Sequence, residues 1–326
     1  MKHVLEIESL TVTFRTENGE VTPVEDVGFA VQPGEIVCIV GESGSGKSVT
    51  SLAILNLLGR SGRIGQGQIR LDGRSLTELT EAELRKARGK EAAMIFQEPM
   101  TALNPVLTIG DQLREAIRLH VGLRGKAAND YAAGLLRDAG IARPESVLKQ
   151  YPHALSGGMR QRVVIAMAIA GKPKLLIADE PTTALDVTVQ AQILALLKRL
   201  RAQHDTAILL ITHDLGVVAE MADRVLVMYA GQIVEETDVF SLFERPLHPY
   251  TKGLMAAVPA IADELEHRLE AIPGSVPDLA RLPAGCRFHP RCPAATDRCR
   301  SETPPLTQSG SGHLVRCWLT GHNPAS

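Results

Sequence analysis

The sequence predicts an α/β fold, in which a mostly parallel sheet carries a helical insertion and an irregular, cysteine-rich segment follows at the C-terminus. The first observation is a phosphate-binding loop, Gly41–Ser48, which reads G-x-x-x-x-G-K-S and lies between an apolar stretch and a helical pattern. The second is the alternation of apolar, strand-like stretches with amphipathic helical ones up to about residue 236. The third is the end of the chain, where nine of the 19 prolines fall from residue 259 onward, a density that disfavours regular elements.

The N-terminal part predicts strands before and around the loop. Residues 4–14 alternate apolar and polar side chains, which indicates an antiparallel strand, and Asn18-Gly19 indicates a hairpin turn into a strand over 24–31. Residues 36–40 are apolar and mostly β-branched, as a buried parallel strand requires, and a helix over 49–58 follows.

The middle of the chain predicts the rest of the α/β domain. We expect short strands near 69–71 and 93–96, with a helix over 81–88 between them, and a proline-containing loop over 100–109. Residues 110–150 predict two or three helices and little strand, which indicates the helical insertion. The elements expected after it are a helix over 159–170, a strand over 174–178, a helix over 187–203, a strand over 207–211, and a helix with two strands to about residue 236.

The composition is that of a globular chain. Its 326 residues are enough for two domains, and 44% hydrophobic with 22% charged residues allow a buried core. The formal net charge of −2 gives no indication of a nucleic-acid-binding or anionic-membrane surface. No apolar run approaches a membrane span, and residues 1–6 carry charges where a signal peptide needs its apolar core. We expect a cytosolic chain that binds no nucleic acid and reaches a membrane only through a partner.

The phosphate-binding loop is the first functional signal. Its glycines let the backbone wrap around a phosphate, and its N–H groups and the following helix N-terminus present positive partial charge to the anion. Lys47 can reach the β- and γ-phosphates of a nucleotide, and the Ser48 hydroxyl can ligate Mg²⁺. The residues expected to contact the nucleotide here are Gly41, Ser43, Gly44, Ser45, Gly46, Lys47, Ser48 and Val49.

Two carboxylates end the apolar strand 174–178. Asp179 is placed to hold Mg²⁺, directly or through water, and Glu180 to polarise an attacking water. Phosphoryl transfer needs mainly a positioned nucleophile and neutralised charge, which such a pair supplies. Two acids at a strand end would carry no function by themselves, but the phosphate loop in the same chain favours the catalytic interpretation.

A second glycine-rich helix start reads Leu155-Ser156-Gly157-Gly158-Met159-Arg160-Gln161. Ser156 can cap the helix and the glycines expose N–H groups, so this too is a small anion site. One nucleotide cannot use both glycine-rich sites unless they belong to different subunits. The pattern resembles the signature motif of ABC transporter ATPases, in which the signature of one subunit closes over the nucleotide held by the other.

This resemblance covers residues 1 to about 257. It implies the P-loop ABC ATPase fold, with a mostly parallel core sheet, an antiparallel β subdomain, and a helical subdomain at about 100–172. It also implies that the chain binds ATP and Mg²⁺ and hydrolyses ATP. The signature residues Ser156, Gly157, Gly158 and Gln161 would then serve the nucleotide of the partner subunit.

Further residues match the family's motifs. Gln97 resembles the loop glutamine that senses Mg²⁺ and the attacking water, and an amide can donate and accept there at once. His213 resembles the switch histidine that contacts the γ-phosphate. Ala184-Leu185-Asp186 resembles the D-loop that crosses the dimer interface, and Phe14 is the candidate for stacking on adenine. The resemblance thus implies Ser48, Gln97 and Asp179 around Mg²⁺, and Glu180, His213 and Gln97 in catalysis.

The C-terminal part resembles a narrower group. Arg245-Pro246-Leu247-His248-Pro249-Tyr250-Thr251, followed by the cysteine-rich tail, resembles the ATP-binding subunits of dipeptide and oligopeptide importers. Within this group the chain most resembles the D-type dipeptide subunits, on the residues Ala178-Asp179-Glu180-Pro181-Thr182-Thr183-Ala184-Leu185-Asp186-Val187 and His289-Pro290-Arg291-Cys292-Pro293. The resemblance implies a homologous second ATPase subunit, two permease subunits, an extracytoplasmic solute-binding protein, and a peripheral place on the cytoplasmic face of the bacterial inner membrane. Alternatives are an importer of nickel, glutathione or another small solute, a soluble ABC ATPase, or a nucleotide-dependent sensor with little turnover.

Four cysteines lie in the proline-rich tail, in the spacing C-x5-C-x6-C-x17-C: Cys286, Cys292, Cys299 and Cys317. In a cytosolic protein such a set indicates metal ligation before disulfides. Zinc sites usually show paired C-x2-4-C knuckles, which are lacking here, and a proline directly after a ligand, as at Cys292-Pro293, is familiar in iron–sulfur sites. The spacing and the resemblance favour a 4Fe–4S cluster with a structural role, with zinc as the alternative.

The expected domains are therefore 1–257, the ATP-binding domain, and 258–326, an extension stapled by the four cysteines. Because proline removes backbone donors, we expect this extension to fold without backbone ladders. We also expect it to be independent of the phosphate loop, so that ATP binding survives changes in the tail.

Overall fold

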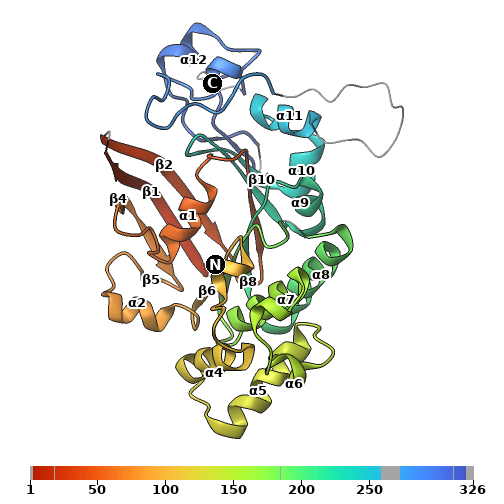
Figure 1. Cartoon of the computed structure of the whole chain (residues 1–326). Helices are drawn as coiled ribbons and strands as arrows, with labels where there is room; N and C mark the ends of the chain where they lie inside the picture. Colours follow the sequence, from red (N-terminus) through yellow and green to blue (C-terminus); the bar gives the residue numbers. More distant parts are fainter. Residues whose placement is uncertain (1–2, 18, 184, 258–271, 311, 321–326) are drawn as a thin grey trace. The chain divides into compact units, whose positions relative to one another are not determined.

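Buried, mostly β-branched and leucine-rich strands form the centre of this computed structural model, which describes residues 3–17, 19–183, 185–257, 272–310 and 312–320. The chain divides into two units, each made of several segments (Figure 1). We call them the helical unit (Met1–Glu6, Ala30–Ile36 and Arg70–Ile211) and the loop unit (Ile7–Phe29, Val37–Ile69 and Thr212–Ser326).

The sheet of the helical unit contains three parallel strands. Strand β7 (Leu175–Asp179) lies between β6 (Ala92–Ile95) and β8 (Ala207–Ile211), and every residue of β7 and β8 is buried. Parallel strands covered on both faces read as continuous apolar runs, which is why the sequence revealed them. Short strand β5 (Arg74–Ser75) pairs antiparallel with the end of β4 (Gly62–Leu71).

Several helices of this unit begin at side-chain caps. Thr80 and Thr108 form capping boxes with Glu83 and Asp111: each threonine hydroxyl accepts from the third helical N–H, and the carboxylate of that third residue accepts from the threonine N–H. Asp186 caps the longest of the described helices through its Oδ1, which accepts from the Val189 N–H at 2.9 Å. The helices are α2 (Glu81–Ala87), α3 (Pro99–Ala102), α4 (Ile109–His120), α5 (Gly125–Asp138), α6 (Pro144–Val147), the 3-10 turn η1 (Pro152–Ala154), α7 (Gly157–Ala168) and α8 (Val187–His204). Helices α4, α5 and α6 confirm the two or three helices predicted for residues 110–150.

The loop unit is built on β3 (Ile36–Val40), which pairs in parallel with β9 (Arg224–Tyr229). Strand β9 continues antiparallel into β10 (Gln232–Asp238). Helix α1 (Lys47–Ile54) follows the phosphate loop, and α9 (Leu215–Met221) is capped by Asp214. A second sheet holds β2 (Gly19–Val31), β1 (Leu5–Thr16) and β4 (Gly62–Leu71), in that order.

Strand β4 is longer than the sequence predicted, because Gly62, Gly65 and Gly67 lie inside it instead of in a preceding loop. At Gly67 the backbone has φ +94°, and a Cβ there would lie 2.5 Å from the carbonyl oxygens of Glu8 and Ser9 on β1. Glycine is therefore required here by the close approach of the neighbouring strand, and not by a turn.

The C-terminal part of the loop unit contains α10 (Val239–Glu244), α11 (Pro249–Ala256), the 3-10 turn η2 (His289–Arg291), α12 (Asp297–Ser301), β11 (Thr307–Gln308) and β12 (Leu314–Val315). The prediction that this segment uses no backbone ladders was wrong, since β12 pairs antiparallel with β10 and β11 pairs with β12. Between Pro305 and the next proline of the chain, at position 324, lie 18 residues, which leaves room for a short ladder.

A buried carboxylate anchors this ladder. Glu235 of β10 is fully buried and accepts the backbone N–H groups of Leu247 (2.7 Å) and His248 (2.9 Å). Its Oε1 also lies 2.7 Å from Nε2 of His313, which precedes β12. Because a buried carboxylate is tolerated only when it is well hydrogen-bonded, Glu235 fixes the extension to the sheet at a definite register.

Candidate functional site

The phosphate-binding loop follows β3 and requires glycine at two of its positions. Gly41 has φ +150°, and a Cβ there would lie 2.2 Å from the carbonyl oxygen of Met228. Gly46 has φ +101°, and a Cβ there would lie 2.5 Å from the carbonyl oxygen of Pro23. Both the left-handed backbone and the close approach exclude other residues. The N–H of Gly231, in the turn between β9 and β10, donates to the Ser45 carbonyl at 2.9 Å and so anchors the phosphate loop to that turn.

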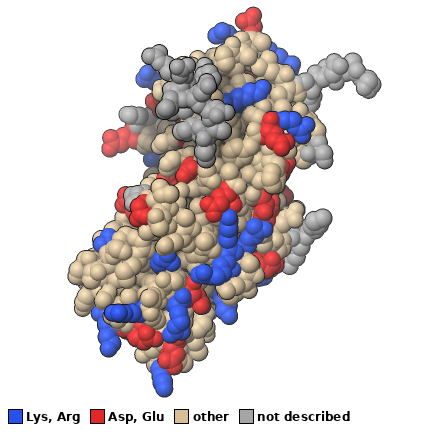
Figure 2. All heavy atoms as spheres, turned by 90° about the vertical axis from the view of Figure 1, so that its right-hand side faces the viewer, with Lys and Arg blue, Asp and Glu red and all other residues tan. Residues whose placement is uncertain are grey.

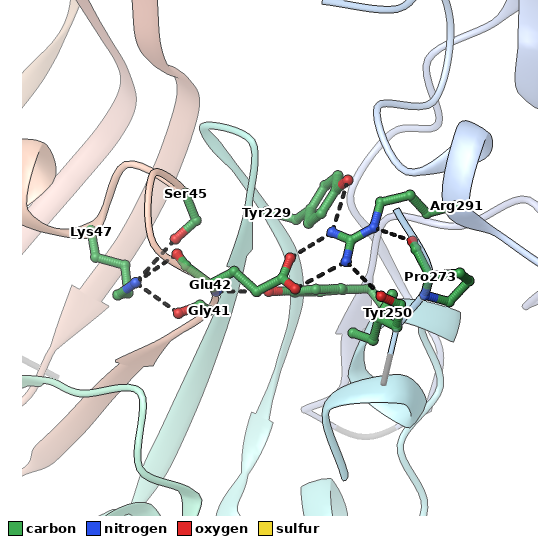
Figure 3. A network of polar contacts seen from close by, with 9 residues as sticks. Gly41, Glu42, Ser45, Lys47, Tyr229, Tyr250, Pro273 and Arg291 are labelled. Carbon is green, nitrogen blue, oxygen red and sulfur yellow. Dashed lines mark hydrogen bonds and ion pairs between the residues drawn. The ribbon is translucent and has the colours of Figure 1, made fainter. Parts of the chain in front are cut away.

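Lys47 places its ammonium inside this loop. Only 6% of the residue is exposed, and Nζ donates to the carbonyl oxygens of Gly41 (2.7 Å) and Glu42 (2.9 Å) and to Oγ of Ser45 (3.3 Å) (Figure 3). A buried positive charge surrounded by backbone dipoles is a point-charge receptor for phosphate. Ser48 and Val49, half-buried, open helix α1 beside it.

In the helical unit the structure brings together two of the predicted catalytic residues. The side-chain amide of Gln97 donates to Oε2 of Glu180 at 2.9 Å, and the Thr183 hydroxyl donates to the same oxygen at 2.8 Å. Glu180 has φ +46°, a strained conformation for a residue with a side chain, and its N–H donates to the carbonyl of Ile211. Asp179, the last residue of β7, is 5% exposed. The carboxylate of Glu180 is thus held in one direction by two donors.

The glycine-rich start of α7 is accessible. Ser156 is exposed and caps the helix, with its Oγ accepting from the Met159 N–H at 3.4 Å, and Gly157 is exposed beside it. Gly158 is half-buried, and a Cβ there would lie 2.6 Å from Cγ1 of Val189. Gln161 differs from these three, because its side chain is buried, 1% exposed, and therefore lies outside the accessible surface on which a partner's nucleotide could bind.

The other sequence-predicted residues lie on three further elements. Asp186 is exposed and caps α8, while its neighbour in the predicted D-loop, Ala184, lies outside the described residues. His213 is exposed directly after β8, between buried Thr212 and the helix cap Asp214. Phe14 on β1 is half-buried, and a Cβ on Gly62 would lie 2.8 Å from its ring, so part of the ring packs against β4. Its stacking on adenine stays a prediction.

The four cysteines of the extension line one small cavity together with His248, Phe288 and Trp318. Burial raises the pKa of Cys286 to about 11, and it also raises the pKa values of Cys292 and Cys317, with the neighbouring thiols adding to each. Four thiolates are the donor set that a 4Fe–4S cluster or zinc needs. As placed, however, no three His, Cys, Asp or Glu side chains of the described residues form a metal-ligand group.

Sequence reasoning missed the residues that support these sites. Thr183, one of Glu180's two donors, lies in a stretch that resembles the family but was assigned no role. Tyr250 and Arg291 contact Glu42 in the phosphate loop, although each lies more than 200 positions from it in the chain (Figure 3). Tyr250 and Arg291 lie in stretches that resemble the peptide-importer subunits, but that resemblance assigned them no contact with Glu42, and the charge of Glu42 does not specify its partner.

The surface and the helices give two further observations. On the face shown in Figure 2, Lys and Arg side chains alternate with Asp and Glu over the described residues, in keeping with the net charge of −2. No helix within the described part of the chain has the length and apolarity needed to cross a membrane.

Comparison with known proteins extends this picture. Residues 24–183 match the family model of ABC transporters, and residues 234–299 match that of the oligopeptide/dipeptide transporter C-terminal region. The chain is 53% identical to the oligopeptide transport ATP-binding protein AppD of Bacillus subtilis (strain 168), over 98% of this chain and 97% of AppD. It is 50% identical to the dipeptide transport ATP-binding protein DppD of Escherichia coli (strain K12), over 96% of each.

Among solved structures, the ATP-binding cassette MJ0796, in a dimeric post-hydrolysis state bound to ADP and Pi, matches with a TM-score of 0.64 and 29% identity, over 72% of this chain and 98% of that one. The fold and the two glycine-rich sites therefore define an ATP-binding cassette, a class whose activity is ATP hydrolysis. The chain belongs to the ABC transporter ATP-binding proteins, in the group that carries the oligopeptide/dipeptide transporter C-terminal region.

Proposed function

We propose that this chain is the ATP-hydrolysing subunit of a bacterial importer of dipeptides or oligopeptides. The observation that carries the proposal is the match over nearly the whole length, C-terminal region included, to ATP-binding proteins named for peptide transport. In this proposal the chain pairs with a homologous ATPase subunit and docks on two permease subunits at the cytoplasmic face of the membrane. An extracytoplasmic binding protein delivers the peptide.

The residues take the following roles in this proposal. Lys47 and the loop N–H groups hold the phosphates of ATP, and the oxygens of Ser48, Asp179 and Gln97 are the kind of ligands that Mg²⁺ prefers. Glu180 orients the attacking water, for which its fixed carboxylate, held by Gln97 and Thr183, is suited. His213 serves the γ-phosphate. When bound, Mg²⁺ neutralises the charge that develops on the transferred group.

Uptake by intact cells tests the transported solute. A strain lacking this chain should lose uptake of labelled dipeptide, and the wild-type chain should restore it. The Glu180→Gln variant should not, because the transporter would assemble without turning over ATP. Restored uptake of nickel or glutathione, with dipeptide uptake unaffected by the deletion, would contradict the peptide assignment and favour another solute.

We further propose that the signature Ser156-Gly157-Gly158 serves ATP held by the partner subunit. The exposed Ser156 and Gly157 at the start of α7 support this. A substitution at Gly158 would test packing against Val189 as much as charge, so Gly157 is the better position, since a Cβ there would meet only Leu185 Cδ2 at 3.8 Å.

For Gly157→Asp we expect steady-state turnover to fall at least about tenfold, because an added carboxylate near a γ-phosphate in a dry site is strongly repelled. An acid in the first turn does not weaken the helix itself. The Gly157→Asn variant has the same shape without the charge and should keep most of the turnover. Binding of ATP to the Lys47 loop should be unchanged in both; a matching loss in Gly157→Asp would place the signature at the chain's own nucleotide.

We propose in addition that one metal centre staples the extension and that its ligands are Cys286, Cys292, Cys299 and Cys317. A 4Fe–4S cluster is the preferred metal centre, and zinc is the alternative. That the four cysteines line one cavity supports this proposal. Protein purified without oxygen should then be brown and contain about four iron atoms per chain. Cys286→Ser should lower the iron content and make the extension more sensitive to protease.

The fifth cysteine supplies the control. Cys38 is fully buried in β3, so Cys38→Ala should leave the iron content unchanged. If anaerobically prepared protein contains stoichiometric zinc and no iron, the assignment of a 4Fe–4S cluster is wrong, and a zinc ion staples the extension instead. If neither metal is found and the extension still resists protease, both are excluded.

A further inference from the structure

Glu42, the second residue of the phosphate loop, is held by the C-terminal part of the loop unit (Figure 3). Its backbone N–H donates to the Tyr250 hydroxyl at 2.8 Å. Its carboxylate accepts two hydrogen bonds from Arg291, with Nη1 at 2.5 Å from Oε2 and Nη2 at 3.0 Å from Oε1. Such a fork-to-fork pair fixes the direction of the carboxylate as well as its distance, which a single contact does not.

The other side of Glu42 faces the nucleotide-binding machinery. Its carbonyl oxygen accepts from Nζ of Lys47 at 2.9 Å and from the N–H of Ser45 at 3.2 Å. One residue thus connects the ammonium that binds phosphate with a guanidinium of the extension. A displacement of Glu42 would move one of the acceptors that place the Lys47 ammonium.

Arg291 itself is firmly placed. Only 4% of its side chain is exposed, its Nε donates to the Pro273 carbonyl at 2.9 Å, and its Nη2 reaches the Ile272 carbonyl at 3.3 Å. Its guanidinium also lies 5.7 Å from the centre of the Tyr229 ring. The hydrogen bonds that Arg291 donates to Glu42 raise the pKa of Arg291, so it is charged at every working pH. The extension itself therefore holds the Arg291 side chain in place, in addition to the contact with Glu42.

Tyr250 is preorganised as well. It is fully buried, and its ring packs against Tyr229, with centroids 4.6 Å apart, and against Phe288, with centroids 5.5 Å apart. Burial raises the pKa of Tyr250, so its hydroxyl stays neutral and its oxygen is available to the Glu42 N–H. Aromatic packing of this kind leaves the hydroxyl little freedom.

We propose that Arg291, with Tyr250, is a positioning residue of the phosphate-binding loop, so that the C-terminal extension sets the affinity for ATP through Glu42. The inference rests on the proposed role of the Lys47 loop in ATP binding. It also differs from the expectation that the extension is independent of this loop: the described part of the extension and the loop lie in one unit, joined by a partly buried ion pair.

The test is ATP binding by the full chain with Arg291→Gln. Loss of the fork leaves the Glu42 carboxylate without its charged partner, and the loop gains conformations that do not bind phosphate. We expect the Kd for ATP to rise about tenfold, ~1.4 kcal/mol. At saturating ATP the turnover of the assembled transporter should stay near that of the wild type, since no group that contacts the reacting atoms has changed. Arg291→Lys should rescue little, because a point charge cannot replace the fork.

Arg316 provides a matched control. Like Arg291, it directly precedes one of the four cysteines, and its side chain is 7% exposed. Its guanidinium donates to the carbonyl groups of Ile233 (3.0 Å) and Pro304 (3.3 Å) and to the carboxylate of Asp26 (3.4 Å). None of these contacts is to the phosphate loop. Arg316→Gln should loosen the extension toward protease as much as Arg291→Gln and leave the Kd for ATP unchanged.

A double-mutant cycle with Glu42→Gln separates a local effect from unfolding. If Arg291 acts through Glu42, the variant with both substitutions should bind ATP no more weakly than Arg291→Gln alone. Additive losses, or equal changes of Kd in Arg291→Gln and Arg316→Gln, would overturn the proposal. So would an unchanged Kd in Arg291→Gln alongside a large loss in Lys47→Ala. If Lys47→Ala itself binds ATP normally, it is the proposed function of the loop that fails.

Discussion

The Lys47→Ala variant should lose ATP binding by at least about a hundredfold, equivalent to ~2.7 kcal/mol. The reason is local: the ammonium is almost fully buried and points at three acceptors of the loop, so its removal takes away the charge that meets the phosphates and one of the contacts that shape the loop. Equilibrium binding of ATP to the purified chain measures this effect.

Its control is Lys126→Ala. Lys126 is an exposed lysine of α5 in the helical unit. The Lys126→Ala variant should therefore bind ATP as tightly as the wild type does. Thermal unfolding of both variants, followed in parallel, shows whether Lys47→Ala has kept its fold. ATP binding of wild-type strength by folded Lys47→Ala would remove the loop from the nucleotide site.

The second large effect is expected for Glu180→Gln. Turnover should fall by about 10²–10⁴, the range that a positioned general base contributes. ATP binding should remain, because the Lys47 loop is untouched, and the paired subunits should accumulate in an ATP-bound closed dimer. Single-turnover hydrolysis and size-exclusion chromatography in the presence of ATP measure the two parts of this prediction.

Thr183→Val distinguishes the carboxylate from its surroundings. It removes one donor to Oε2 of Glu180 and keeps the charge, so it should lower turnover far less than Glu180→Gln. Hydrolysis by Glu180→Gln near the wild-type rate in the assembled transporter would show that another residue positions the water.

The sequence predicted the parts of the molecule that depend on local patterns. Strands β3, β7 and β8 are short apolar runs buried on both faces, and a functional residue lies at the end of each or within two positions after it: Gly41, Asp179 and His213 in turn. Parallel strands deliver their carboxyl ends to one edge of a sheet, so strand ends and motifs point to the same chemistry. The start of α7 at Gly157 follows in the same way from Ser156, which is a good helix cap.

What the sequence did not predict depends on contacts between distant segments. The glycines of β4 looked like a loop because their close approach to β1 is visible only in the folded chain. The ladder of β12 on β10 follows a proline-rich stretch that locally opposes it. The pair of Glu42 with Arg291 joins residues 249 positions apart, and neither residue type specifies a partner by spacing. For the same reason the contact between the extension and the phosphate loop was not expected from the sequence.

The central claim is that this chain couples ATP hydrolysis to peptide import. Phosphate release should therefore be measured from the complete transporter in lipid vesicles, with and without peptide-loaded binding protein. The account predicts that loaded binding protein raises the rate of ATP hydrolysis, and that Glu180→Gln in this chain removes the rise. A rate that is the same with and without loaded binding protein, or a rise that survives Glu180→Gln, would contradict it.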